Sequence, residues 1–438
     1  MKKYAVLAAL LIIALVLTSC AAVPVPAAQP QAAEPQAAAT ASTSAEPVTL
    51  TILAFVPEKY YRPLFDAFEA SHPNIKINLE AVTLDTSVSA VLQRYSAGDT
   101  TYDIVLADQS WTGSLAGPGA LLDLTDTAYG KEAKAKFPES VLAGSTYQGK
   151  LVAGPYWGSF EILFYNKTLL KQAGVDFPSQ DPAAAWTYEQ VFEAAKKAQA
   201  AGAKWGYAEY QPGNYYGRQP LIESAGGGSG LTGPDLLTPD VNNAGWKTAL
   251  TFYGKIFAEG LSPRGLVCCA QADPFFNNGE LAFYVSQAPI AGALDSDVDY
   301  GIAPMPKWEG GKGYSPSGSG AWGINPNSPH IDAALEFISF HTLTLEGAMA
   351  GTEVAGIPAL PEGAAARLAV AIEADPRLAG LDTLQAAMSN LSVARPPSTK
   401  YSAFEIATNA AILDIENGLD VTVTLDALQE KLTALLSR

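Results

Sequence analysis

Apolar positions between residues 49 and 106 alternate between strand-like and helix-like spacing. Residues 49–56 (TLTILAFV) are apolar and β-branched, whereas 74–82 (NIKINLEAV) alternate apolar with polar positions, as half-buried strands do. The helix expected between them has one apolar face, made by Tyr61, Leu64, Phe65 and Phe68. A second helical pattern precedes a short apolar strand at 103–106. Strand, helix, strand, helix, strand is typical of α/β folds and predicts a mostly parallel sheet.

The same alternation returns in the rest of the chain. Strands are expected at 161–165, 280–286, 300–303 and 321–324. Helices are expected from Thr187, over 249–257, after Ser328-Pro329 and twice near the C-terminus. Loops rich in Gly and Pro are expected at 226–233, 310–320 and 356–361. The chain after residue 47 is too long for one small core and predicts two lobes.

The first 47 residues have a different character. Lys2 and Lys3 precede an apolar run over 5–17 that is too short to span a bilayer comfortably, and Cys20 follows small residues. This pattern predicts a signal peptide over 1–19 with lipidation of Cys20. Residues 21–47 are rich in Ala and Pro and contain no aromatic residue, which predicts a disordered tether over 20–47. An ordinary signal peptide or an uncleaved anchor is the alternative.

Charge and cysteine content exclude several classes of protein. The net charge is −17, from 27 basic and 44 acidic residues, without a basic cluster, so nucleic acid is not expected as a partner. Beyond Cys20 only the adjacent Cys268 and Cys269 remain, so the fold does not depend on a disulfide framework. No second apolar stretch is long enough to cross a membrane. We expect a monomer.

Catalytic and cofactor motifs are weak. The three histidines, His72, His330 and His341, are far apart and are expected to be surface or capping residues. Residues 144–151 have phosphate-loop spacing but lack its Ser or Thr, and are better explained as a turn between short strands. The carboxylates at 295–299 begin like a calcium loop and then depart from it. We therefore predict no metal, no cofactor and no enzymatic activity.

Aromatic residues near predicted strand ends and loops are the informative set. The carboxyl ends of strands line the ligand crevice in open α/β sheets. Ring faces bind the apolar faces of sugars, and polar side chains bind the hydroxyl groups. Trp111, Trp157, Tyr216, Trp322 and Tyr401 are candidates for the first role, and Asp108 and Gln287 for the second. Packing under loops is the alternative for each ring.

Six segments carry a resemblance to a known family. They lie at 64–77 (LFDAFEASHPNIKI), 103–124, 147–166 (YQGKLVAGPYWGSFEILFYN), 276–283 (FNNGELAF), 300–306 (YGIAPMP) and 320–340. In order and spacing the chain resembles family 1 of the extracellular solute-binding proteins of bacterial ABC importers, the branch of maltose-binding-protein-like carbohydrate-binding lipoproteins. The resemblance implies a two-lobed α/β fold of the type II periplasmic-binding-protein kind, with a ligand cleft between the lobes.

The resemblance also implies boundaries. Crossings between the lobes are expected near 153–158, 312–318 and 356–361. The first lobe then comprises 48–155 and 315–358, and the second comprises 156–314 and 359–438.

Individual positions match the family as well. Glu58 and Lys59 match sugar-contacting positions, Tyr216 matches a stacking tyrosine, and Trp111 lies on the ligand loop. Pro289 and Glu405 stand where maltose-binding protein has stacking tryptophans, so maltose itself is not implied. The full set of expected ligand contacts is Glu58, Lys59, Asp108, Trp111, Trp157, Tyr216, Gln287, Trp322 and Tyr401.

The expected function is the capture of an extracellular carbohydrate by closure of the lobes, followed by its delivery to the permease subunits of an ABC importer. The expected location is extracytoplasmic, lipid-anchored to the membrane, in a periplasm or on a cell surface. Three alternatives stay open. They are a tethered carbohydrate-active enzyme, a receptor for a polyol, glycerophosphodiester or peptide, and a lipoprotein that binds only protein or wall polymer.

Overall fold

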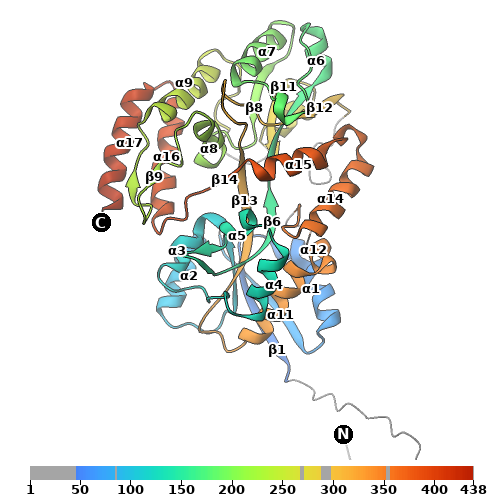
Figure 1. Ribbon diagram of the computed structural model, residues 1–438, viewed down its shortest axis with the longest axis vertical. Helices are drawn as coiled ribbons and strands as arrows, with labels where there is room; N and C mark the ends of the chain where they lie inside the picture. The colour runs from blue at the N-terminus through green and yellow to red at the C-terminus, as the bar shows by residue number, and fades with distance from the viewer. Residues whose placement is uncertain (1–45, 84–85, 267–270, 288–296, 352–355, 438) are drawn as a thin grey trace, which may run out of the picture. The chain divides into compact units, whose positions relative to one another are not determined.

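Two β-sheets organise the chain, one in each lobe (Figure 1). The computed structural model describes residues 46–83, 86–266, 271–287, 297–351 and 356–437. The signal peptide, Cys20 and the tether up to residue 45, and Cys268 and Cys269, lie outside these ranges. No helix within them is long and apolar enough to cross a membrane.

The sheet of the first lobe has the order β14-β13-β3-β1-β2, with β6 also paired to β13. β1 is parallel to β2 and β3, whereas β13 is antiparallel to β3 and β6 and parallel to β14. The strands are β1 (Val48–Ala54), β2 (Ile75–Ala81), β3 (Ile104–Asp108), β6 (Gly154–Ser159), β13 (Ser315–Ile324) and β14 (Ser392–Ala394). Two short strands, β4 (Thr146–Tyr147) and β5 (Lys150–Leu151), form a separate hairpin.

Helices cover both faces of this sheet, because successive strand residues point to opposite sides. Ile52 belongs to a core shared with the predicted face of α1, whereas Leu53 belongs to a second core on the other face. Tyr61, Leu64, Phe65 and Phe68 are all buried, as the periodicity predicted. The helices of this lobe are α1 (Glu58–Ser71), α2 (Ser87–Ser96), α3 (Thr112–Ala116), α4 (Ala128–Lys136), α5 (Glu139–Ala143), α11 (Ile331–Leu343) and α12 (Leu345–Ala350).

The second lobe is built on a four-stranded sheet with the order β12-β7-β11-β8. Its strands are β7 (Glu161–Asn166), β8 (Trp205–Glu209), β11 (Leu281–Gln287) and β12 (Tyr300–Ala303), and β9 (Leu231–Thr232) pairs with β10 (Thr238–Pro239) elsewhere. Its helices are α6 (Lys167–Gln172), α7 (Tyr188–Ala200), α8 (Tyr215–Ser224), α9 (Ala244–Ala258), α10 (Asp273–Asn277), α14 (Pro361–Ala374), α15 (Leu381–Asn390), α16 (Tyr401–Glu416) and α17 (Val421–Leu436). One continuous apolar core joins them.

The prediction of mostly parallel sheets is wrong for this second sheet. β7 is antiparallel to both β11 and β12, and only β11 and β8 are parallel. The strand order places β7, by which the chain enters the lobe, between two later strands that run in the opposite direction. Helix and strand spacing alone carries no information on that direction.

The three predicted crossings lie side by side. β6 pairs with β13, and the Gly158 amide donates to the Ile357 carbonyl at 3.1 Å. The expected glycine-rich loop over 310–320 is partly wrong, because Ser315–Gly320 belongs to β13. Glycine is required there by close approach: a Cβ on Gly320 would lie 2.0 Å from Trp157 Nε1, and one on Gly318 would lie 2.5 Å from Ser159 Oγ.

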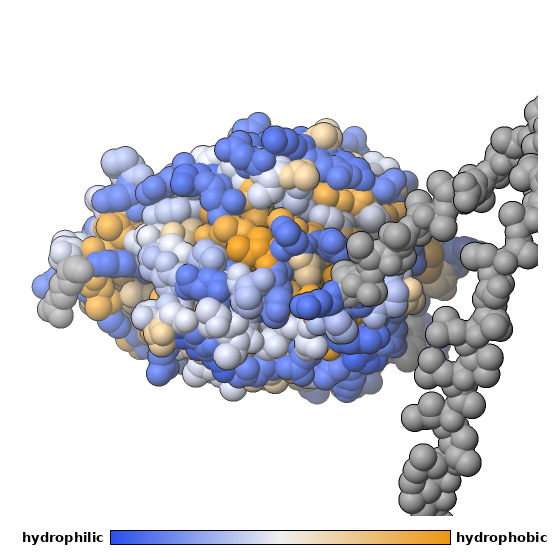
Figure 2. All heavy atoms as spheres, turned by 90° about the horizontal axis from the view of Figure 1, so that it is seen from below, coloured by the Kyte–Doolittle hydropathy of each residue, from blue (hydrophilic) through white to orange (hydrophobic). Residues whose placement is uncertain are grey.

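Two smaller predictions concern turns and surfaces. Residues 148–149 form the predicted turn between short strands, with positive φ at Gln148 and Gly149. Figure 2 shows hydrophilic and near-neutral residues over much of the face seen from below, with an apolar area near its centre and smaller apolar areas toward its edges. A mostly polar surface is what the high net charge of the chain leads us to expect.

Candidate functional site

The carboxyl ends of β1 and β3 bring the first group of predicted residues to one edge of the first-lobe sheet. β1 is followed by the start of α1, which carries Glu58 and Lys59, and β3 ends at Asp108. Trp111 follows within a short 3₁₀-helix, Gln109–Trp111. Parallel strands that end at the same edge place their following loops together, as expected for a ligand crevice.

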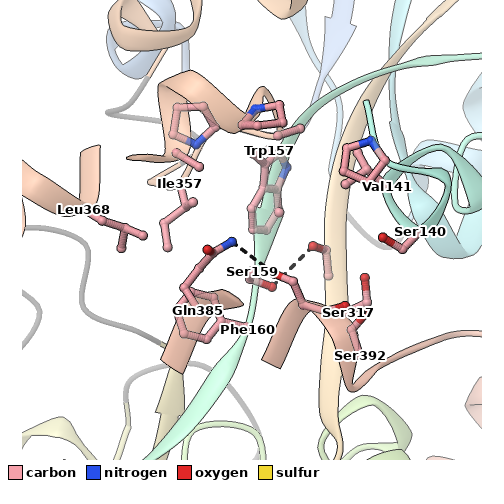
Figure 3. A pocket seen from close by; sticks show the side chains of 18 of the residues that line it. Ser140, Val141, Trp157, Ser159, Phe160, Ser317, Ile357, Leu368, Gln385 and Ser392 are labelled. Carbon is pink, nitrogen blue, oxygen red and sulfur yellow. Dashed lines mark hydrogen bonds between the residues drawn. The ribbon is translucent and has the colours of Figure 1, made fainter. Parts of the chain in front are cut away.

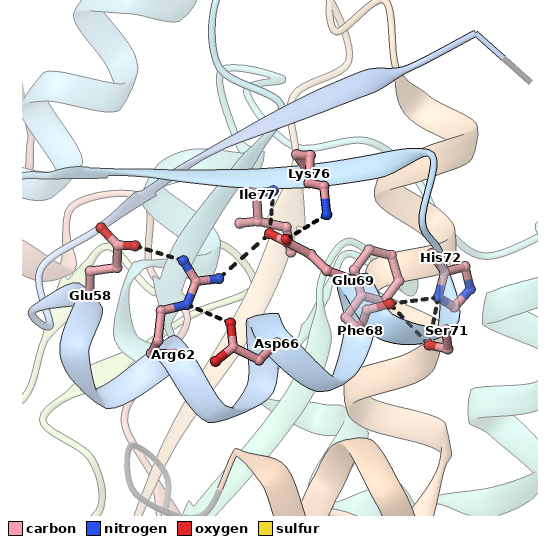
Figure 4. A network of polar contacts seen from close by, with 9 residues as sticks. All are labelled: Glu58, Arg62, Asp66, Phe68, Glu69, Ser71, His72, Lys76 and Ile77. Atoms are coloured by element: carbon pink, nitrogen blue, oxygen red, sulfur yellow. Dashed lines mark hydrogen bonds and ion pairs between the residues drawn. The ribbon is translucent and has the colours of Figure 1, made fainter.

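Glu58 takes part in an ion-pair network on the exposed side of α1 (Figure 4). Its carboxylate accepts from Arg62 Nη1 at 3.0 Å, and Arg62 also pairs with Asp66 and Glu69. Glu58 remains 46% exposed in its side chain. Its contact with Arg62 contributes little to stability, since exposed pairs are screened by water.

Lys59 and Trp111 differ in accessibility. The Lys59 ammonium is exposed and lies 4.7 Å from the centre of the Tyr60 ring. Trp111 is only 8% exposed and packs edge-to-face on Phe55, with ring centres 5.5 Å apart. Most of the Trp111 ring is therefore committed to the core under α3.

Four side chains from both lobes meet where the crossings join them, and we call Asp108, Ser159, Tyr216 and Arg395 the inter-lobe cluster. Tyr216, in the first turn of α8, has its hydroxyl 3.0 Å from Ser159 Oγ at the end of β6. The Arg395 guanidinium lies 5.1 Å from the centre of the Tyr216 ring. Burial raises the pKa of Tyr216, so its hydroxyl stays protonated as a donor.

Asp108 and Arg395 join the lobes by an ion pair. Arg395 Nη2 lies 2.7 Å from Asp108 Oδ1, and the side chains are 10% and 19% exposed respectively. The same Asp108 oxygen accepts from the Ser110 amide at 2.9 Å, which fixes the carboxylate at the end of β3. A second contact between the lobes is the Ser114 hydroxyl, which donates to the Thr399 carbonyl at 3.2 Å. The lobes therefore touch each other directly in this structure.

Two predicted contacts are corrected by their burial. Trp322 is fully buried, stacks on Tyr156 with ring centres 4.8 Å apart, and donates to His341 Nδ1 at 2.7 Å. Tyr401 is also fully buried, and its hydroxyl donates to Glu405 at 2.9 Å. Neither ring has surface to offer to a solute, because each completes the core of its own lobe.

Gln287 and the histidines have other outcomes. Gln287 ends β11 beside Glu161, and its role in binding stays a prediction. His72 and His330 lie at helix ends, as expected. The expectation for His341 is wrong: its ring is buried under β13, and burial lowers its pKa to about 3. The described residues contain no group of three or more His, Cys, Asp or Glu side chains arranged for a metal ion.

A cavity of about 390 Å³, the crossing pocket, lies against the strands that join the lobes. Figure 3 shows Trp157 pointing into it between Ile357 and Val141. Gln385 and Ser389 of α15 line it as well. Ser317 and Gly318 of β13 also line this pocket, and a Cβ on Gly318 would stand 2.9 Å from the Tyr216 hydroxyl oxygen. Ser159 of the inter-lobe cluster lines this pocket as well, so the pocket and the cluster adjoin each other.

Sequence reasoning missed Arg395 as a site residue. It follows β14 in the segment Ala394-Arg395-Pro396-Pro397, which has no hydrophobic period. An arginine between a short strand and two prolines is a weak signal, because its partner Asp108 is distant in sequence. Only the pairing of β3 and β14 with the same edge of β13 brings the two together.

The fold and this arrangement define a two-lobed α/β protein of the solute-binding type. Two α/β lobes are joined by adjacent crossings, and polar and aromatic side chains of both lobes meet at the joint. The chain belongs to the bacterial extracellular solute-binding protein family, whose sequence profile matches residues 56–344.

Several known proteins are similar to this chain. A binding protein of Brucella abortus (strain 2308) is 25% identical over 283 residues, which cover 60% of this chain and 64% of the relative. The maltodextrin-binding protein of Bacillus subtilis (strain 168) is 27% identical over 253 residues, 54% of this chain and 56% of that protein. This chain thus matches less than two thirds of the length of either relative. An ABC substrate-binding protein from Listeria monocytogenes, solved with cycloalternan, superposes with a TM-score of 0.74 at 21% identity, covering 90% of this chain and all of that one.

Proposed function

We propose that this protein is the substrate-binding component of an ABC importer and captures a carbohydrate outside the cytoplasm. The observation that carries the proposal is the inter-lobe cluster. There a carboxylate, a guanidinium and a tyrosine ring from different lobes converge at the joint of the crossings. Such a set provides donors, an acceptor and an apolar face, which together suit a polyhydroxylated ring that enters while the lobes are apart, since Tyr216 is only 5% exposed with the lobes in contact.

Binding would act on the equilibrium between open and closed lobes. Asp108 belongs to the first lobe, and Tyr216 and Arg395 belong to the second, so only a closed protein offers all three to one solute. A solute that contacts both lobes shifts the population toward the closed state by its extra affinity for that state. The permease would then distinguish loaded from empty protein by the arrangement of the lobes.

Several observations support a sugar as the solute. The solved relative from Listeria monocytogenes holds cycloalternan, and the relative from Bacillus subtilis is named for maltodextrin. Glu58, Lys59, Trp157 and Gln287 remain accessible at least in part and extend the proposed contact set beyond the cluster. Trp157 offers a partly exposed indole face beside the crossings.

Attachment to the membrane is part of the proposal. The signal-like run over 5–17 and Cys20 predict a lipid anchor, and the Ala- and Pro-rich segment up to residue 47 would let the folded lobes reach a permease. Mass spectrometry of the mature protein tests this arrangement. We expect an N-terminal diacylglyceryl-modified Cys20, and Cys20→Ala should release the protein from membranes.

A thermal-shift screen tests the proposed solute class. Protein that begins at residue 46 should be stabilised by at least one sugar from a panel of mono- and oligosaccharides, polyols, glycerophosphodiesters and amino acids. At a ligand concentration 100 times Kd the stabilisation is about 2.7 kcal/mol. A hit confined to polyols, glycerophosphodiesters or amino acids would replace the sugar, and recovery of a cleaved sugar would establish an enzyme instead.

Tyr216 should contribute measurably to solute affinity. Tyr216→Ala removes the ring that lies beside Arg395 and should weaken binding of the best sugar by about 1 to 2 kcal/mol, as expected for lost stacking. Isothermal titration measures this loss. The matched control is Tyr216→Phe, which keeps the ring, loses the hydrogen bond to Ser159 and should bind nearly as well as the wild type. Equal affinity of the Ala and Phe variants would remove the ring from the site.

A further inference from the structure

Asp108 and Arg395 lie beside the part of β13 between the segments that pair with β3 and with β14. β3 pairs with Gly320–Ile324 and ends at Asp108, while β14 pairs with Ser315–Ser317 and is followed by Arg395. The two strands thus approach each other along β13, and their end residues face each other across residues 318–319. The 2.7 Å ion pair bridges this gap.

The pair keeps hydrogen-bonding capacity that the protein does not use. Arg395 is nine-tenths buried, and its Nε has no hydrogen-bond partner among the described residues. A guanidinium carries five N–H donors, and the contact with Asp108 engages Nη2. A buried donor without a partner is costly, so a solute oxygen placed here would relieve that cost.

The charges around this position cancel. Burial opposes the charge of Arg395, but Asp108 raises the pKa of the guanidinium, so Arg395 stays positive beside a negative partner. Burial raises the pKa of Glu405, which accepts from Tyr401, and so favours its neutral form. Arg395 is the only cation of the inter-lobe cluster, and the Asp108 carboxylate lies 2.7 Å from it. An anionic solute that approached Arg395 would therefore be repelled by Asp108.

We infer that Asp108 sets the charge selectivity of the site, so that it accepts uncharged polyhydroxylated solutes and rejects their carboxylated analogues. The inference rests on the proposed function and narrows its solute class. Asp108 accepts from solute hydroxyl groups and occupies Arg395, which a carboxylate would otherwise pair with bidentately. The repulsion of a solute carboxylate by Asp108 thus contributes to selectivity as much as the attraction of solute hydroxyl groups does.

The test compares matched pairs of probes by isothermal titration: glucose with glucuronate, galactose with galacturonate, and the corresponding trisaccharides. Wild-type protein should bind the neutral member of one pair at least tenfold more tightly than its acid. Asp108→Asn leaves Arg395 without its counter-ion and should lower that preference at least tenfold. Asparagine keeps the side-chain oxygen that accepts from the Ser110 amide, so the turn after β3 is preserved.

Two further variants secure the result. Asp108→Ser, also neutral and able to accept from the Ser110 amide, should shift the preference in the same direction. Asp123→Asn breaks an exposed ion pair with Lys150 in the same lobe, at 3.2 Å, and should leave the preference unchanged. Binding of a neutral sugar with an unchanged preference in both Asp108 variants would overturn the inference alone. Absence of binding by every protein to every probe would instead remove the proposed function, and the inference with it.

Discussion

Raising the pH from about 5 to 8 should destabilise this protein, and Glu161→Gln should abolish much of that loss. Glu161 begins β7 and is buried, and the burial raises the pKa of its carboxyl to about 8 despite the charge of Arg218 nearby. An unfolded chain ionises the same group near its ordinary pKa of 4.5. Between these values the folded state holds a proton that the unfolded state has lost.

The sign of the effect follows from that difference. Because the folded state binds more protons, the free energy of unfolding falls as the pH rises through the window from 4.5 to about 8. Each pH unit inside the window costs about 1.4 kcal/mol for a single group. Glutamine resembles the protonated acid, so the variant and the wild type should be similar at pH 5, and the variant should be more stable by several times RT at pH 8.

Urea unfolding at pH 5, 6, 7 and 8 measures this difference. Glu132→Gln is the control, because Glu132 is an exposed residue whose carboxylate pairs with Lys136 at 3.0 Å. That variant should track the wild type at every pH. Parallel curves for Glu161→Gln and the wild type over the whole range would show that Glu161 is not held protonated.

Trp322→Ala should be among the most destabilising single changes in the first lobe. The indole is fully buried, stacks on Tyr156 and donates to His341 at 2.7 Å. Removing it leaves a cavity and an unpaired imidazole nitrogen, and large-to-small changes of this kind cost about 3 to 5 kcal/mol. Chemical denaturation followed by circular dichroism measures the loss.

Two comparisons separate packing from the hydrogen bond. Trp322→Phe keeps an aromatic ring but loses part of the indole volume and the donor to His341, so its cost should be below that of alanine. Trp205→Ala, at a half-buried position at the start of β8, should cost less than Trp322→Ala. A loss for Trp322→Ala no larger than that for Trp205→Ala would contradict the view that Trp322 is a core residue and would return it to the set of solute contacts.

Local sequence patterns predict much of the observed secondary structure correctly. The predicted face of α1 is buried as a unit, and the turn at 148–149 lies between short strands. Period and turn chemistry depend on neighbours within a few residues, so sequence alone reveals them. The direction of the strands in the second sheet depends on which strands pair with each other, and so does the extended conformation of the glycines in β13. Local hydrophobic periods carry no information on strand pairing.

Some residues of the candidate site could likewise be predicted from the sequence, and others could not. Asp108 and Tyr216 were placed by strand-end position and by resemblance, and both lie in the inter-lobe cluster. Trp322 and Tyr401 have the same sequence character as a ligand-stacking ring, because an aromatic residue at a strand or helix end can face either a cleft or a core. Burial decides between these outcomes, and burial is a property of the packed lobes.

By itself the sequence determined the alternation of strands and helices, the two-lobed family and the acidic character of the chain, because composition, period and motif order are local or additive properties. The tertiary structure alone decided that Arg395 meets Asp108, that Trp322 and His341 complete a core, and that Glu161 is buried. Each of these depends on contacts between residues far apart in the chain, and the desolvation and charge that follow exist only once the lobes have packed.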